Sequence, residues 1–333
     1  MRIGSAAARV LRALVAAAVA VVVSGAAHAA SLGPRSCAGV DYNAMLLDII
    51  AELPKGGGYS IGADFVSPAV QAHNIGAGRW EMRVYDGHPS HCTSATYALF
   101  ARLVAVLHNN GSITLSREEM RALEVHRRLP DGSQLVDGEG PYWIFNANGA
   151  GVAALFKHTG IGISFRDDAL AYARPGDFLK LFWNDNVGAS EKGHQVVYLG
   201  RRDVGGRDMI CFWGSQRQGM KKRGRKEARY FPAKAGGTVV DGYGEACRPR
   251  SDIKDMVFSR ITCMESLPAG LDAMQMRADA RGTGPLGMPQ PFVDDFLFSL
   301  RNKSSDQATL NRLYDIQPAP ASLATLTQLP QSP

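Results

Sequence analysis

The sequence predicts an α+β fold in which a cysteine-bearing helix packs on an antiparallel β-sheet. Two patterns support this class. Apolar residues recur at every fourth position over residues 92–107, which is typical of a helix. Three strand-like runs then follow at residues 178–183, 194–200 and 209–213, separated by turns as in an antiparallel meander. The chain has 333 residues, of which 45% are hydrophobic, so it can build a sizeable core.

The first 29 residues are expected to form a cleaved signal peptide. Three arginines precede the apolar run at residues 13–23, and Ala27-His28-Ala29 offers the small-x-small pattern of signal peptidase. The run is too short and too rich in alanine for a stable membrane anchor. Removing the three arginines lowers the formal charge from +6 to +3. We therefore expect an exported protein, periplasmic or secreted, without a membrane anchor.

Five cysteines are present, and an odd number in an oxidising compartment leaves one thiol unpaired. Cys92 is the candidate for the free thiol. Among the three ways to pair the other four, we expect Cys247 with Cys263, which flank a short strand-like run, and Cys37 with Cys211. No spacing of cysteines or histidines is typical of a structural zinc site, so no metal or cofactor is expected.

Cys92 is expected on the first turn of its helix. Pro89 and Ser90 suit a helix start, and Asn109-Asn110-Gly111 suits its end. At the helix start the dipole favours thiolate over thiol, so a nucleophilic cysteine is predicted. The competing interpretation is a buried or disulfide-bonded cysteine.

Several further elements are predicted around this helix. The patterns favour helices within residues 37–53 and 116–127, and strands near residues 59–65 and 80–85. The loop at residues 137–149 is rich in aromatic residues and glycine, and either lines a substrate groove or covers the core. Its candidate substrate-binding residues are Tyr142, Trp143, Asn146 and Asn148.

The second half of the chain carries the candidate histidine. Pro175-Gly176-Asp177 forms a turn that leads into the apolar run at residues 178–183. In the next strand, alternation places His194, Val196 and Tyr198 on one face. A third strand, residues 209–213, leads into Gly214-Ser215-Gln216.

In this order, Cys92, Pro175-Gly176-Asp177 and the segment Gly193-His194-Gln195-Val196-Val197-Tyr198-Leu199-Gly200 resemble the NlpC/P60 and CHAP group of papain-like cell-wall hydrolases. The resemblance covers residues 80–216. His91-Cys92-Thr93-Ser94 stands where that group commonly has Asp-Cys-Ser-Gly, and the interval from cysteine to histidine is longer than its commonest.

The resemblance implies a papain-like core and cleavage of amide bonds in the peptide part of peptidoglycan. Cys92 would be the nucleophile, His194 its ion-pair partner and proton donor, and Ser215 or Gln216 the group that orients the imidazole. Two alternatives remain open at this point. One is another thiol acyl enzyme, a protease or an acyltransferase, on the same scaffold, and the other is a catalytically silent wall-binding protein.

The catalytic domain is expected to span residues 30–267. Within it lies a basic cluster that either contacts a polyanion or forms a solvated loop. Its residues are Lys221, Lys222, Arg223, Arg225 and Lys226. Residues 252–262 are expected to form the last strand or helix of the domain. Residues 268–333 are predicted to be a loosely structured to disordered tail, because they end in sequence rich in Pro, Ala, Ser and Gln.

Overall fold

A computed structural model describes residues 37, 39–60, 66, 68–124, 152–185, 192–222, 225–228, 230–273 and 316–317. In this part of the chain the fold is α+β with a mostly antiparallel sheet, as predicted. The predicted signal peptide, the aromatic loop with Tyr142, Trp143, Asn146 and Asn148, and most of the predicted tail lie outside the described residues.

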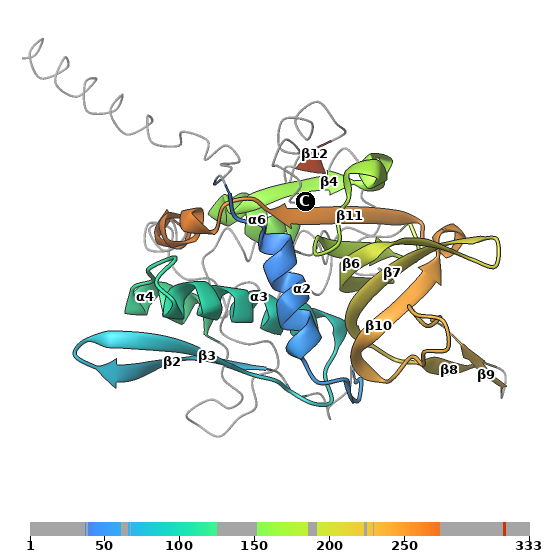
Figure 1. Ribbon diagram of the computed structural model, residues 1–333, viewed down its shortest axis with the longest axis horizontal. Helices are drawn as coiled ribbons and strands as arrows, with labels where there is room; N and C mark the ends of the chain where they lie inside the picture. Colours follow the sequence, from blue (N-terminus) through green and yellow to red (C-terminus); the bar gives the residue numbers. More distant parts are fainter. Residues whose placement is uncertain are drawn as a thin grey trace, which may run out of the picture. The chain divides into compact units, whose positions relative to one another are not determined.

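Figure 1 shows the arrangement of the described helices and strands. The helices are α2 (Tyr42–Glu52), α3 (Cys92–Asn109), α4 (Arg117–Leu123) and α6 (Ala153–Thr159), with 3-10 turns η1 (Asp167–Tyr172), η2 (Arg250–Asp252) and η3 (Met264–Ser266). The strands are β1 (Gly56–Gly57), β2 (Ala69–Gly76), β3 (Arg79–Tyr85), β4 (Gly162–Arg166), β5 (Phe178–Phe182), β6 (Gly193–Val204), β7 (Arg207–Gln216), β8 (Gly219–Lys222), β9 (Arg225–Ala228), β10 (Gly242–Pro249), β11 (Asp255–Ile261) and β12 (Ile316–Gln317).

The main sheet has eight strands within the described residues, in the order β1-β10-β7-β6-β5-β11-β4-β12. The predicted meander is confirmed, because β5, β6 and β7 pair with one another antiparallel. The expected last element is strand β11, which inserts between β5 and β4. The expectation of a loose tail is wrong at two places: residues 267–273 are helical, and β12 pairs parallel with β4 with Ile316 buried.

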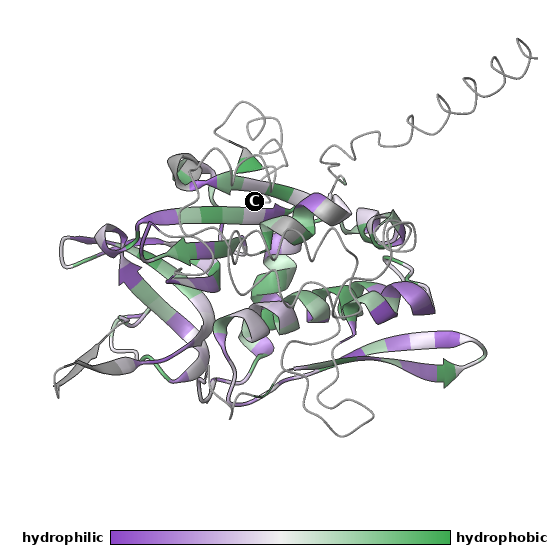
Figure 2. Ribbon diagram, turned by 180° about the vertical axis from the view of Figure 1, so that it is seen from behind, coloured by the Kyte–Doolittle hydropathy of each residue, from purple (hydrophilic) through white to green (hydrophobic). Residues whose placement is uncertain are grey.

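The main sheet carries a different apolar layer on each face. Phe178, Val197 and Trp213 join the layer that contains the buried side of α3. Val196 and Phe212, on the same strands but at alternate positions, join the opposite layer. Successive side chains of a strand point to opposite faces, so each strand contributes to both layers. Figure 2 shows hydrophobic residues along much of α3 and over the middle of β11.

Helix α3 begins one residue later than Ser90 would suggest. The N-cap is His91, whose ring Nδ1 accepts hydrogen bonds from the backbone N–H groups of Thr93 and Ser94. Ser94 completes a capping box by accepting from the His91 backbone N–H through its hydroxyl oxygen. The predicted end is confirmed, since the helix stops at Asn109. These contacts fix the first turn, which carries Cys92.

Two other helices show how closely local patterns match the structure. Helix α2 is capped by Asp41, which accepts from the backbone N–H of Ala44. Helix α4 has the predicted cap, Ser116, in a capping box with Glu119, but ends at Leu123 and not at residue 127.

The predicted strand at residues 80–85 is β3, which pairs with β2 in a hairpin beside α3 (Figure 1). Of the strand predicted at residues 59–65, Tyr59 makes only an isolated bridge to Ser90, and residues 61–65 lie outside the described part.

The turn Pro175-Gly176-Asp177 ties β5 to distant parts of the chain. Asp177 is fully buried and receives a hydrogen bond at each carboxylate oxygen from Arg260 on β11, both at 2.8 Å. Its Oδ1 also accepts from Asn43 on α2 at 2.8 Å. Gly176 has a φ of 95°, and a Cβ there would lie 2.7 Å from the Asn43 carbonyl oxygen. The sequence motif is therefore a buried structural junction.

The disulfides differ from the expected pairing. Cys211 bonds to Cys247 and Cys37 bonds to Cys263. Cys211 and Cys247 are register partners on β7 and β10, so strand pairing brings them together, which spacing along the chain does not reveal. All five cysteines lie in the described residues, and Cys92 is the free one, as predicted.

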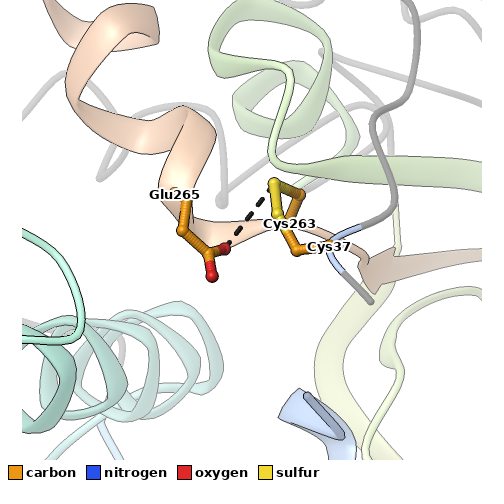
Figure 3. A group of neighbouring side chains, drawn as sticks. All are labelled: Cys37, Cys263 and Glu265. Atoms are coloured by element: carbon orange, nitrogen blue, oxygen red, sulfur yellow. Dashed lines mark hydrogen bonds between the residues drawn. A yellow bond between two sulfur atoms is a disulfide. The ribbon is translucent and has the colours of Figure 1, made fainter. Parts of the chain in front are cut away.

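Cys37, Cys263 and Glu265 form a compact group (Figure 3). Metal binding by cysteine requires a thiolate, and both sulfur atoms here are bonded to each other. Glu265 accepts a hydrogen bond from the Tyr42 hydroxyl at 2.7 Å, and burial together with this carboxylate raises the pKa of Tyr42. The group therefore anchors α2 near the end of β11 and offers no thiolate for a metal.

Candidate active site

Cys92 is the first residue of α3, and although the residue as a whole is partly exposed, its sulfur is buried. The backbone N–H groups of Cys92, Thr93 and Gln195 lie near enough to this sulfur to lower the pKa of the thiol. Cys92 and Thr93 belong to the first turn of the helix, and Gln195 belongs to β6, so the thiol lies where α3 meets the sheet. N–H groups arranged around one point can stabilise an anion formed there.

The pKa of the Cys92 thiol is raised, contrary to the expected thiolate. Burial is the largest influence, because it disfavours the charged sulfur. The N–H groups and the positive charge of Lys180 act in the opposite direction but do not outweigh burial. The helix start therefore carries a thiol that needs further stabilisation, such as that of a bound substrate, to react as a thiolate.

Lys180 is the site residue that sequence reasoning missed. It lies in the middle of β5, is 2% exposed and stands opposite Gln195 in the strand register. Its Nζ lies 5.4 Å from the centre of the Phe182 ring, and its charge acts on Cys92. Buried lysines are rare, so a lone lysine inside the apolar run at residues 178–183 was the available signal.

His194 does not lie on the face of the sheet that α3 covers. Its ring packs against Tyr230 at 5.8 Å between ring centroids, Phe212 at 5.7 Å and Trp183 at 6.4 Å. The prediction that His194, Val196 and Tyr198 share one face is confirmed, but that face belongs to the layer opposite α3. The predicted Cys92–His194 ion pair is therefore not formed in this structure, because Gln195 takes the position on β6 that faces the helix.

Neither candidate for the third catalytic residue joins Cys92 to His194. Ser215 lies on the opposite face of the sheet from His194, and Gln216 lies on the opposite face from Cys92. Ser215 shares the α3 face with Trp213, and its hydroxyl oxygen accepts from the Ser90 hydroxyl at 2.7 Å. Gln216 points to the other face and donates from Nε2 to the Gly244 carbonyl oxygen at 2.8 Å. Ser215 thus supports the segment just before Cys92, and Gln216 joins β7 to β10.

Two histidines near Cys92 have structural contacts. Burial lowers the pKa of His91 to about 4, so its ring is neutral near neutral pH and its Nδ1 can accept the cap hydrogen bonds. His88 packs edge-on against Tyr243 at 4.9 Å between ring centroids. A Cβ on Gly57 would lie 2.2 Å from the His88 ring, so glycine is required at that close approach.

The predicted basic cluster is only partly described. Lys221 and Lys222 lie in β8, and Arg225 and Lys226 lie in β9, so the cluster belongs to a two-stranded hairpin rather than to a loop. Arg223 lies outside the described residues. The predicted contact with a polyanion stays a prediction.

No family model matches this chain, and no match was found among curated proteins or among solved structures. In the described part of the chain, no helix has both the length and the hydrophobicity needed to cross a bilayer. The residues around Cys92 are therefore the basis for inferring function.

Proposed function

We propose that this protein is an exported cysteine hydrolase that cleaves amide bonds in the peptide part of peptidoglycan, with Cys92 as the nucleophile on a papain-like core. One observation carries the proposal. The single thiol outside the disulfides lies on the first turn of a helix that packs on an antiparallel sheet, where backbone N–H groups of α3 and β6 and the charge of Lys180 all favour its anion.

The proposed reaction proceeds through a thioester. The sulfur of Cys92 attacks the amide carbonyl carbon, so an S–C bond forms while the C–N bond breaks, and the thiol proton leaves on the amine. Water then cleaves the thioester, which restores the thiol and releases a carboxylic acid. Lys180 takes the electrostatic role that the resemblance assigned to His194, because its positive charge stabilises the sulfur anion.

The cellular setting and the substrate rest on separate support. The amino-terminal sequence has the pattern of a signal peptide, and the two disulfides fit an oxidising compartment such as a periplasm or the exterior. Peptidoglycan as substrate is supported by the motif order that resembles cell-wall hydrolases. A protease or acyltransferase would use the same thioester, and mass spectrometry of products from purified sacculi distinguishes these reactions.

A silent wall-binding protein is the second candidate, and two observations favour it. Burial raises the pKa of the Cys92 thiol, and His194 lies on the other face of the sheet. A scaffold that no longer turns over substrate has no need for a reactive sulfur. The reactivity of Cys92 therefore separates the two candidates.

The deciding experiment measures the alkylation rate of Cys92 as a function of pH. A folded-state pKa above the usual value of about 8.5 predicts that the rate is low near neutral pH and rises through alkaline pH. Lys180→Met removes a charge that lowers this pKa, so we expect about tenfold slower alkylation at about pH 8 than in wild type.

His194→Ala is the matched control, since its ring packs in the opposite layer. We expect it to leave the alkylation profile within about twofold of wild type. Hydrolysis of sacculi by wild type, lost in Cys92→Ala, supports the enzyme. A thiol that resists alkylation at every pH, with no product from sacculi, would leave the binding protein as the function.

A further inference from the structure

Gln195 is a buried side chain whose polar atoms have no hydrogen-bond partner among the described residues. The residue is 1% exposed, and neither its Nε2 nor its Oε1 has a hydrogen-bond partner there. Buried polar groups are almost always hydrogen-bonded, and an unsatisfied one is unfavourable in the folded state. A carboxamide in this condition beside a nucleophilic thiol indicates a place for a ligand.

The position of Gln195 connects it with Cys92. Its backbone N–H lies near enough to the Cys92 sulfur to lower the pKa of the thiol, and its side chain projects from the α3 face, as does that of its register partner Lys180. Directly opposite residues on antiparallel strands have Cβ atoms only about 5 Å apart. A thiol, an ammonium group and a carboxamide therefore gather where the first turn of α3 meets β5 and β6.

We propose that the Gln195 carboxamide recognises an amide group of the substrate next to the bond that Cys92 attacks. A carboxamide offers both donors and an acceptor, so Nε2 can donate to an amide carbonyl oxygen while Oε1 accepts from an amide N–H. A substrate amide supplies both complementary groups, whereas an ester lacks the N–H donor. The inference rests on the proposed function in taking Cys92 as the nucleophile.

The test compares two reagents that modify Cys92, one with an amide and one without. With iodoacetamide the sulfur displaces iodide from the methylene carbon, and the thiol proton passes to solvent. Dithiodipyridine reacts by disulfide exchange and carries no amide. Rates are divided by those of free glutathione with the same reagent, so that only the effect of the site remains.

Gln195→Leu and Gln195→Met remove the polar atoms while keeping the size of the side chain. We expect the iodoacetamide rate to fall about five- to tenfold relative to wild type, which corresponds to one lost hydrogen bond, and the dithiodipyridine rate to stay within about twofold. Equal changes with both reagents, or no change, would overturn the proposal. Gln216→Leu is the matched control, since that amide bonds Gly244 on the other face and should not affect selectivity.

Two further readouts separate this inference from a structural role and from the proposed function. An amide without a bond in the free protein predicts that Gln195→Leu holds or raises the melting temperature, so a loss of several degrees would show that the amide is structural. If alkylation is amide-selective and depends on Gln195 but the protein does not digest sacculi, the inference stands and the hydrolase is rejected. Digestion of sacculi at the wild-type rate by Gln195→Leu would keep the hydrolase and reject the inference, because the loss of one substrate hydrogen bond predicts a reduction of about five- to tenfold.

Discussion

The two faces of the main sheet bury polar groups for different purposes. On the face that α3 covers, Lys180 and Gln195 lie near Cys92, and the amide of Gln195 has no partner among the described residues. On the other face, His194 is enclosed by aromatic rings and Gln216 bonds the backbone of β10. Among the described residues Gln216 also leaves its Oε1 without a partner, but its Nε2 is bonded, whereas both polar atoms of Gln195 lack one and lie near a thiol. The α3 face is therefore distinguished by an entirely unbonded carboxamide near a thiol, and not by a histidine.

The largest expected effect is a difference in turnover between a variant on the α3 face and a variant on the other face. Cys92→Ala should reduce hydrolysis of sacculi by at least about 1000-fold, because no thioester can form. His194→Ala should keep turnover within about fivefold while lowering stability by about 1–3 kcal/mol, because it opens a cavity between aromatic rings. Product release and urea unfolding measure the two quantities. Complete loss of turnover in a folded His194→Ala would return the histidine to the active site.

The next effect concerns pH and the start of α3. The folded-state pKa of His91 is about 4, below its usual value of about 6.5, so the unfolded state binds the proton more readily. The contribution of this group to the free energy of unfolding is complete above about pH 6.5 and falls by about 3 kcal/mol as pH decreases toward 4.

His91→Asn is the matched variant for that prediction. Asparagine accepts cap hydrogen bonds as well as or better than other residues but does not titrate in this range. We therefore expect the variant to keep stability near neutral pH and to lose the acid-dependent decrease. Urea unfolding at a series of pH values measures the difference, and an unchanged acid profile in the variant would assign the decrease to another group.

The smallest expected effect concerns two buried serine pairs. Ser215→Ala removes hydrogen bonds to Ser90, just before Cys92, and should cost about 1 kcal/mol of stability and a few-fold of turnover. Ser259 on β11 and Ser164 on β4 form a hydroxyl pair with 2.9 Å between their oxygen atoms. Ser259→Ala breaks this pair and should lower the free energy of unfolding by about 1 kcal/mol with turnover unchanged. Equal turnover in both variants would show that the Ser90–Ser215 contact does not position the thiol.

Local pattern was sufficient for much of the fold near Cys92. The fourth-residue repeat and the stop at Asn109 defined α3, and the alternation from His194 to Tyr198 was correct. Such features depend on neighbours a few residues away, so the sequence alone contains the relevant information. The free state of Cys92 likewise followed from the odd number of cysteines.

Contacts between distant segments decided the rest. Val196 and Val197 are equally apolar, so the sequence did not reveal which of them, and hence His194 or Gln195, faces α3. The pairing of Cys211 with Cys247 depends on the register of β7 and β10. The direction of the Cys92 pKa depends on how deeply the sheet and the helix bury the sulfur, because the loss of water outweighs the favourable N–H groups and the charge of Lys180. These outcomes are set by packing across the chain, which is why only the tertiary structure could establish them.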